Sequence, residues 1–259
     1  MTRFSHTFGC GSLTLAGTLD TAPGTAGLLI VSGGNEVRSG AFSGQAELAT
    51  RVARAGFPVF RFDRRGVGDS EGENRGFRKS ARDIATALEA FRAMAPQITR
   101  VVGFGNCDAA SALMLAGGAG CDGLVLSNPW TIEQGSKTAT PPPAAIRSRY
   151  LEKLKDPREI GRLLGGGVNL RKLGRGLVQS LKPAPPPSTL AGEMRDGLAG
   201  FTGEVRILLA TADRTAHVFE AAWDASDPRI RRCHGAGHSY VEPAHRDWLT
   251  SEILAALRA

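Results

Sequence analysis

Cysteine is scarce in this chain and occurs in no spacing typical of metal binding. The 259 residues include four cysteines, and no two of them form a CxxC pair. The sequence therefore predicts neither a zinc site nor a disulfide framework, and it indicates no metal or other cofactor. Free thiols persist in a reducing compartment, where they stay available for chemistry. The four residues are Cys10, Cys107, Cys121 and Cys233.

Long apolar runs are missing as well. The first eleven residues are polar and lack the apolar stretch of a signal peptide. No segment approaches the ~20 apolar residues that cross a bilayer. We therefore expect a cytoplasmic protein with no integral membrane segment.

Aromatic residues make up only 6% of the chain, and they do not alternate with basic residues. The formal net charge is +7, which by itself would suit a nucleic acid, an anionic lipid or an acidic substrate. The basic residues are spread out and accompany no recognition motif. We therefore predict no nucleic-acid partner.

What the chain does contain is an alternation of short apolar runs with helical patterns. It begins with a glycine-containing hairpin pattern at residues 6–19. The alternation predicts an α/β fold, in which a mostly parallel sheet is covered by helices on both faces. The predicted strands are 27–31, 57–62, 100–104, 123–127, 205–210 and 229–233, and the main predicted helices are 42–55, 78–94 and 242–257.

Residues 129–203 interrupt this alternation, because they show no strand pattern and contain two proline clusters. Helical patterns are present at 144–154 and 157–164. Such a block predicts an inserted helical cap, with 1–128 and 204–259 forming the core. Its arginines could contact an anionic group of the substrate, but a solvated helix face is the simpler interpretation. They are Arg147, Arg149, Arg158, Arg162, Arg171 and Arg175.

The most informative local feature is segment 101–113, where an apolar strand enters a turn of small residues and then a helix. This is the context of the G-x-S-x-G nucleophile elbow, whose strained turn lifts the nucleophile above the sheet edge. Cys107 replaces the serine, and Gly105 and Ala109 are the small residues that let the strand and helix approach each other. A helix N-terminus and a nearby imidazole would favour the nucleophilic thiolate. The alternative is a small buried cysteine that only begins the helix.

Two further residues follow predicted strands in the order nucleophile, acid, base. Asp213 comes shortly after the run 205–210, and His238 lies in a glycine-flanked loop before the last helix. Asp213 could instead cap the helix that follows it. His234 and His245 are weaker candidates, because we place one on the last strand and the other inside the final helix.

A glycine-rich loop follows the first predicted parallel strand. We expect Gly34, with Asn35 as the next choice, to supply one backbone N–H of an oxyanion hole. The other N–H would come from Asp108, the residue after the nucleophile. The glycines lack the spacing of a phosphate-binding loop.

The segment 63–72 has the pattern D-x-R-G-x-G-x-S. We expect Asp63, Arg65 and Ser70 to hold this turn together beside the site rather than to take part in chemistry. With the features above, the pattern resembles the α/β-hydrolase family over almost the whole chain. The resemblance implies an α/β-hydrolase fold.

More narrowly, the chain is similar to the bacterial exosortase A system-associated hydrolase 1 family. The similar features are the Ser-Gly-Gly-Asn loop, the 63–72 turn, the Gly-Asn-Cys-Asp-Ala elbow, Asn128-Pro129-Trp130 and the helical stretch 147–177. The resemblance implies a cytoplasmic acyl hydrolase or transferase encoded alongside exopolysaccharide and protein-sorting genes, and it implies no particular substrate. The elbow cysteine also resembles that of dienelactone hydrolases and polyhydroxyalkanoate synthases, which differ in chain length and cap.

These expectations combine into one mechanism. Cys107 attacks an ester or thioester carbonyl of a small-molecule substrate, His238 takes its proton, and Asp213 orients the imidazole. Water then releases the acyl group. The first alternative is an acyltransferase, in which an alcohol or amine takes the acyl group, and the second is a catalytically silent binding module. The sequence leaves the oligomeric state open.

Overall fold

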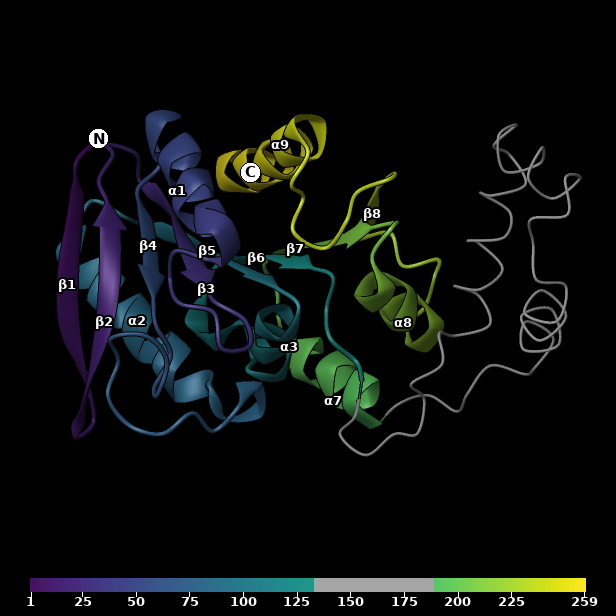
Figure 1. The fold of residues 1–259 in the computed structure, drawn as a ribbon, viewed down its shortest axis with the longest axis horizontal. Helices are drawn as coiled ribbons and strands as arrows, with labels where there is room; N and C mark the ends of the chain where they lie inside the picture. Colours follow the sequence, from purple (N-terminus) through teal and green to yellow (C-terminus); the bar gives the residue numbers. More distant parts are fainter. Residues whose placement is uncertain (133–188) are drawn as a thin grey trace, which may run out of the picture.

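The computed structural model describes residues 1–132 and 189–259, and Figure 1 shows their arrangement. The helices predicted at 144–154 and 157–164 lie outside this range, and so do the six arginines of the predicted cap. Within it, no helix is long and apolar enough to cross a membrane.

The described residues form a sheet of eight strands in the order β1-β2-β4-β3-β5-β6-β7-β8. The strands β1 and β2 form an antiparallel hairpin, and β2 also pairs antiparallel with β4. All the other neighbours pair in parallel. The bounds are β1 (Arg3–Cys10), β2 (Leu13–Asp20), β3 (Ala26–Val31), β4 (Val59–Phe62), β5 (Arg100–Asn106), β6 (Gly123–Ser127), β7 (Glu204–Ala210) and β8 (Ile230–Cys233).

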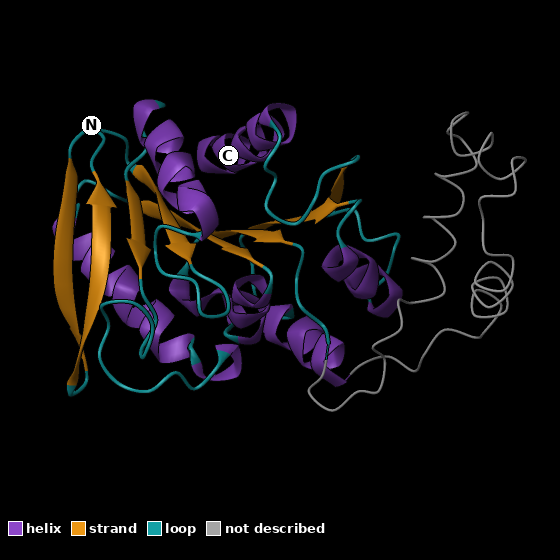
Figure 2. Ribbon diagram, viewed as in Figure 1, coloured by secondary structure: helices purple, strands orange, loops and turns teal. Residues whose placement is uncertain are grey.

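Helices cover both faces of the sheet (Figure 2), as the alternating sequence pattern predicts. One face carries α1 (Gly44–Arg54) and α9 (Pro243–Arg258). The other carries α2 (Ala81–Met94), α3 (Asp108–Leu115), α7 (Thr189–Leu198) and α8 (Arg214–Ala222). A strand buried on both faces must be apolar along its whole length, and β6 accordingly reads GLVLS with every residue buried.

Two helices begin later than the sequence pattern predicts. The pattern at 42–55 gives a 3-10 turn, η1 (Ala41–Ser43), before α1, because Phe42 has the left-handed φ of 50°. The pattern at 78–94 likewise begins in a 3-10 turn, η2 (Phe77–Lys79), ahead of α2. A third such turn, η3 (Gly117–Gly120), follows α3. The prediction of the elements was correct, and the error lies at their ends.

The helix α7 falls within the predicted insertion 129–203, yet it packs on the core. Its residues Leu190, Ala191 and Met194 are fully buried in the cluster that also contains α3. The two helices approach closely at Gly197, where a Cβ would lie 2.3 Å from the carbonyl oxygen of Met114. This contact joins the end of the predicted insertion to the sheet domain.

The strand β3 lies between β4 and β5, so the strand that follows it in the chain is added on one side of β3 and the next strand on the other side. The chain therefore leaves β3 toward one edge of the sheet and returns to β5 on the other side. Loops that follow such neighbouring parallel strands diverge and leave a crevice at their carboxyl ends. The glycine-rich loop after β3 and the cysteine turn after β5 thus meet at one place.

Candidate active site

Cys107 stands at the turn between β5 and α3 with φ 62° and ψ −127°. This backbone conformation is rare for a residue with a side chain, and such strain occurs most often at functional sites. The turn is held by hydrogen bonds, since the Cys107 amide donates to the Ser127 carbonyl at 2.9 Å. Cys107 is partly exposed, whereas the other three cysteines are buried. The elbow predicted from the sequence is therefore present with its thiol accessible.

The two small residues of the elbow have a steric reason. A Cβ on Gly105 would lie 2.6 Å from the backbone carbon of Ala109 and 2.7 Å from the Ala110 nitrogen. Ala109 itself is fully buried. The strand and the helix thus approach as closely as the motif requires.

The structure brings His238 and Asp213 together. His238 Nδ1 lies 2.7 Å from Asp213 Oδ2, although the residues come from the loops after β8 and β7. The second carboxylate oxygen of Asp213 accepts a 3.1 Å hydrogen bond from the Thr215 amide and caps α8. The two sequence interpretations of Asp213, helix cap and partner of a histidine, therefore both hold, one for each oxygen.

The charge state of His238 depends on its two neighbours. Hydrogen bonding to Asp213 and then to Cys107, with a smaller opposing effect of burial, raises the pKa of His238 to about 10. Because Nδ1 is turned to Asp213, Nε2 is the nitrogen left for the thiol. The arrangement favours an imidazolium beside the sulfur.

Two asparagines to which the sequence pattern assigns no catalytic role hold the loop that carries His238. Asn106 and Asn128 both donate side-chain hydrogen bonds to the His238 carbonyl, at 3.2 and 3.5 Å. Asn128 is fully buried with a φ of 42°, and its side-chain oxygen accepts from the Ala210 amide at 2.8 Å. The signal available in the sequence was an asparagine directly after a buried strand and before a proline. Its partners come from other strands and could not be read locally.

The loop after β3 lies against the elbow, but its amide is already engaged. Gly34 N–H donates to Asp108 Oδ1 at 2.6 Å. The buried Arg64 donates to the Gly34 carbonyl at 2.6 Å and lies 3.7 Å from the same Asp108 carboxylate. The structure therefore brings together Gly34 and Asp108, but in this arrangement a carboxylate holds the N–H predicted for an oxyanion.

The next residues of this loop differ in their surroundings. Asn35 is exposed, and its side-chain oxygen accepts from Asn74 at 2.8 Å. Glu36, to which the sequence pattern assigns no role, lies close enough to His238 and Asp108 for their charges to shift its pKa. Partial burial is the largest effect on Glu36 and raises its pKa; His238 lowers it and Asp108 raises it. A carboxyl group thus stands beside the candidate site.

The 63–72 turn supports the loop, as its residues predict. Ser70 Oγ donates to the Asp63 carbonyl at 2.7 Å and accepts from the Ala16 amide at 2.9 Å. Asp63 accepts from the Arg38 amide at 2.5 Å. Arg65 instead forms an ion pair with Asp83 on α2. These contacts tie the turn to the hairpin, to α2 and to the glycine-rich loop.

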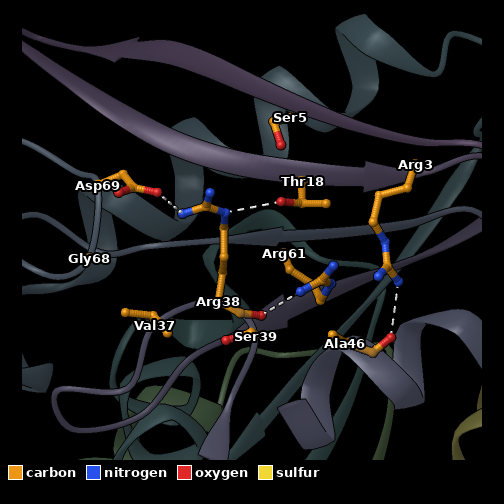
Figure 3. A pocket seen from close by; sticks show the side chains of 10 residues that line it. All are labelled: Arg3, Ser5, Thr18, Val37, Arg38, Ser39, Ala46, Arg61, Gly68 and Asp69. Carbon is orange, nitrogen blue, oxygen red and sulfur yellow. Dashed lines mark hydrogen bonds and ion pairs between the residues drawn. The ribbon is translucent and has the colours of Figure 1, made fainter.

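A cavity of about 340 Å³ is lined by residues of the β1-β2 hairpin and by residues 37–39 of the loop that follows β3 (Figure 3). Its guanidinium groups belong to Arg3, Arg38 and Arg61. Asp20 pairs with Arg3 at 2.6 Å and with Arg61 at 3.5 Å, and Asp69 pairs with Arg38 at 2.8 Å. Figure 3 shows Arg38 reaching between Thr18 and Asp69. We interpret this cluster as a paired network that fixes residues 37–39.

The two weaker histidine candidates are His234 and His245. His234 directly follows β8 instead of lying on the strand as predicted, and His245 lies within α9 as predicted, 3.5 Å from Glu242. Burial raises the pKa of the Cys121 thiol to about 12 and also raises that of Cys233. In the described ranges no group of three or more histidine, cysteine or acidic residues could hold a metal ion. The chemistry available at the site is that of an imidazole, His238, which has the Cys107 thiol and the Asp213 carboxylate as its two hydrogen-bond partners.

Comparison with known proteins gives one family and many similar folds. A model of the alpha/beta hydrolase family matches residues 28–252. A search of curated protein sequences gives no significant match.

Among solved structures, the alpha/beta hydrolase GrgF from Penicillium sp. sh18 is similar with a TM-score of 0.65 and 15% identity, covering 100% of this chain and 98% of that one. The esterase Pf2001 of Pyrococcus furiosus is similar with a TM-score of 0.63 and 14% sequence identity, and the match covers 99% of this chain and 90% of that one. Est1E from Butyrivibrio proteoclasticus, solved with bound ferulic acid, has a TM-score of 0.60 and 14% sequence identity. The match covers 98% of this chain and 100% of that one. At these identities the likeness establishes a shared fold.

Proposed function

The chain belongs to the alpha/beta hydrolase family, and from this premise we propose that it is an acyl hydrolase of esterase or thioesterase type whose nucleophile is Cys107. The observation that carries the proposal is the row formed by Cys107, His238 and Asp213. The thiol is accessible at a strained elbow, and the imidazole is fixed by a 2.7 Å contact to a carboxylate. A nucleophile, a base and a group that orients the base are the parts that acyl transfer needs.

The first half-reaction forms a thioester with the enzyme. The Cys107 thiol gives its proton to His238 Nε2, the sulfur attacks the carbonyl carbon of the substrate, and the carbonyl electron pair moves to oxygen. In this proposal the backbone N–H of Asp108, at the start of α3, donates a hydrogen bond to that oxyanion. When the tetrahedral species collapses, the bond to the leaving group breaks, and His238 Nε2 gives its proton to the departing atom.

The second half-reaction releases the acyl group. His238, now neutral, takes a proton from water as the water attacks the thioester carbonyl. The carbon–sulfur bond then breaks, and the acid leaves. Asp213 stabilises the imidazolium each time it forms, which fits the direction of the His238 pKa.

The sequence resemblance supports a narrower placement. The motifs shared with the exosortase A system-associated hydrolase 1 family favour a cytoplasmic enzyme of an exopolysaccharide or protein-sorting system. Transfer of the acyl group to an alcohol or amine remains the alternative outcome of the same chemistry. Discharge of acylated Cys107 decides between them, since a transferase releases the acyl group faster to an added alcohol or amine than to water.

The test of the proposal is turnover of a short p-nitrophenyl ester. Cys107→Ala is expected to abolish it, and Cys107→Ser to retain a part. Cys121→Ala serves as the matched control, because that thiol is buried away from the site. Undiminished turnover in Cys107→Ala would reject the nucleophile, and a wild-type protein that reacts with no acyl probe would favour a binding module.

A further inference from the structure

A second cavity, of about 330 Å³, lies between α1, α9 and the loop that follows His238. Its inner wall is apolar and includes Leu48, Phe104 and Leu249. Two apolar side chains at its lining are strongly exposed, Phe42 at 97% and Val241 at 66%. These two exposed side chains give the apolar cavity an apolar rim, as expected of a small-molecule site.

This cavity adjoins the reacting groups. It is lined by Asn106, which precedes Cys107 in the chain, and by Ser239 and Tyr240, which follow His238. Glu36 also lines it and is close enough to His238 and Asp108 for their charges to act on it. A substrate bound at Cys107 can therefore extend into the cavity past His238.

The chemistry decides which half of the substrate lies on the side of His238. The atom that receives the proton of His238 must lie on the histidine side of the carbonyl carbon. We propose that this cavity binds the leaving-group half of the substrate, and that this half is an uncharged, mainly apolar alcohol or thiol. The proposal rests on the acyl hydrolase function above and adds the substrate class.

The charges of the lining argue against an anionic group there. Arg246 is engaged with Glu47, whose carboxylate accepts its hydrogen bond at 2.9 Å. Among the described residues Glu36 forms no ion pair, and its carboxylate accepts a 3.4 Å hydrogen bond from Gln45. A carboxylate or phosphate in the cavity would add a negative charge to a lining that already holds Glu36 and Glu47 against the single guanidinium of Arg246. The interpretation of an anionic substrate, drawn from the predicted cap, is thus not supported at this cavity.

The volume limits the size of the occupant. Small-molecule sites span roughly 300–1,000 Å³ and are mostly apolar with a few polar groups. A cavity near the lower bound suits one aromatic ring or a short alkyl chain, rather than a polymer.

Binding is tested first, without turnover, in Cys107→Ala. The probes are benzyl alcohol and 4-(hydroxymethyl)benzoate, which share a ring and differ by a carboxylate, measured by calorimetry at about pH 8. We expect benzyl alcohol to bind at least about tenfold more tightly. Leu48→Trp, which fills the cavity, and Phe42→Ala, which removes its exposed ring, should each weaken binding. The matched control is Phe4→Ala, an exposed phenylalanine on β1.

Kinetics then test the leaving-group assignment with phenyl acetate and 4-carboxyphenyl acetate. We expect kcat/KM to favour phenyl acetate by about tenfold, and Leu48→Trp and Phe42→Ala to reduce this preference while Phe4→Ala keeps it. Equal binding of both alcohols, or no effect of either cavity variant on an active enzyme, would overturn the inference. The acyl hydrolase proposal fails in a different way, through turnover that does not depend on Cys107.

Discussion

The amide of Gly34 donates a 2.6 Å hydrogen bond to the carboxylate of Asp108, 74 positions away in the chain. The carboxylate is held in place by the loop and by the nearby guanidinium of Arg64. It therefore occupies the N–H of Gly34, which the sequence predicts as an oxyanion donor, and in the proposed mechanism it would bring a negative charge next to the developing oxyanion.

Removing this carboxylate should help catalysis. Asp108→Ala keeps its own backbone N–H and frees that of Gly34, and one such donor is worth about 10²–10³ in kcat. We expect kcat for p-nitrophenyl acetate to rise by roughly tenfold or more. Asp108→Asn, which still offers an acceptor to Gly34, should change less. A fall in kcat for Asp108→Ala would show instead that the carboxylate positions the loop.

Alkylation should single out one cysteine. Cys107 is partly exposed, whereas Cys10, Cys121 and Cys233 are buried. We expect iodoacetamide at neutral pH to modify Cys107 first, as measured by peptide mass spectrometry over time. Cys107→Ser should remove the fast phase and leave the slow ones. Equal rates at all four thiols would contradict an activated Cys107.

Asp213 should control the titration of His238. The pKa of His238 is raised to about 10, with Asp213 as the largest cause. Its charged form therefore stabilises the fold fully below its ordinary pKa of about 6.5, and this contribution is lost as the pH rises toward 10. Asp213→Asn should move the His238 titration to lower pH, as followed by NMR of the imidazole. An unchanged titration would mean that Asp213 does not hold the charge.

The same pH range should limit activity. In the proposed mechanism His238 protonates the leaving group and must therefore be an imidazolium at that step. It loses this ability when it is deprotonated at alkaline pH. The alkaline limb of kcat/KM is expected to move to lower pH in Asp213→Asn. Thr215→Pro removes the N–H that donates to Asp213 Oδ1 and so tests the capping role of that oxygen. It should lower the stability of α8 more than it shifts the alkaline limb of kcat/KM.

The elbow should not tolerate a larger residue at Gly105. A Cβ there would lie 2.6 Å from the backbone of Ala109, so Gly105→Ala should lower the free energy of unfolding. Overpacking of this kind costs about 1–3 kcal/mol, measurable by urea unfolding. Gly192→Ala in α7 is the matched control, since a Cβ there meets nothing within 4 Å. Equal stability of the two variants would mean that the elbow relaxes easily.

Much of the architecture follows from local pattern. The apolar runs predict the strands because a buried parallel strand must be apolar on both faces, and the small residues around Cys107 predict the elbow because only they allow the close approach. The starts of α1 and α2 were missed because positive φ at Phe42 and the 3-10 turns leave no periodic signal.

The sequence by itself determined the α/β order, the elbow and the succession of Cys107, Asp213 and His238. Only the tertiary structure decided that Gly34 is bound to Asp108, that Asn128 joins Ala210 to the His238 carbonyl, and that a cavity lies beside the histidine. The reason is that periodicity and turn chemistry act between near neighbours, whereas these contacts join loops from different strands. Their partners are chosen by sheet register and loop path, which no short segment encodes.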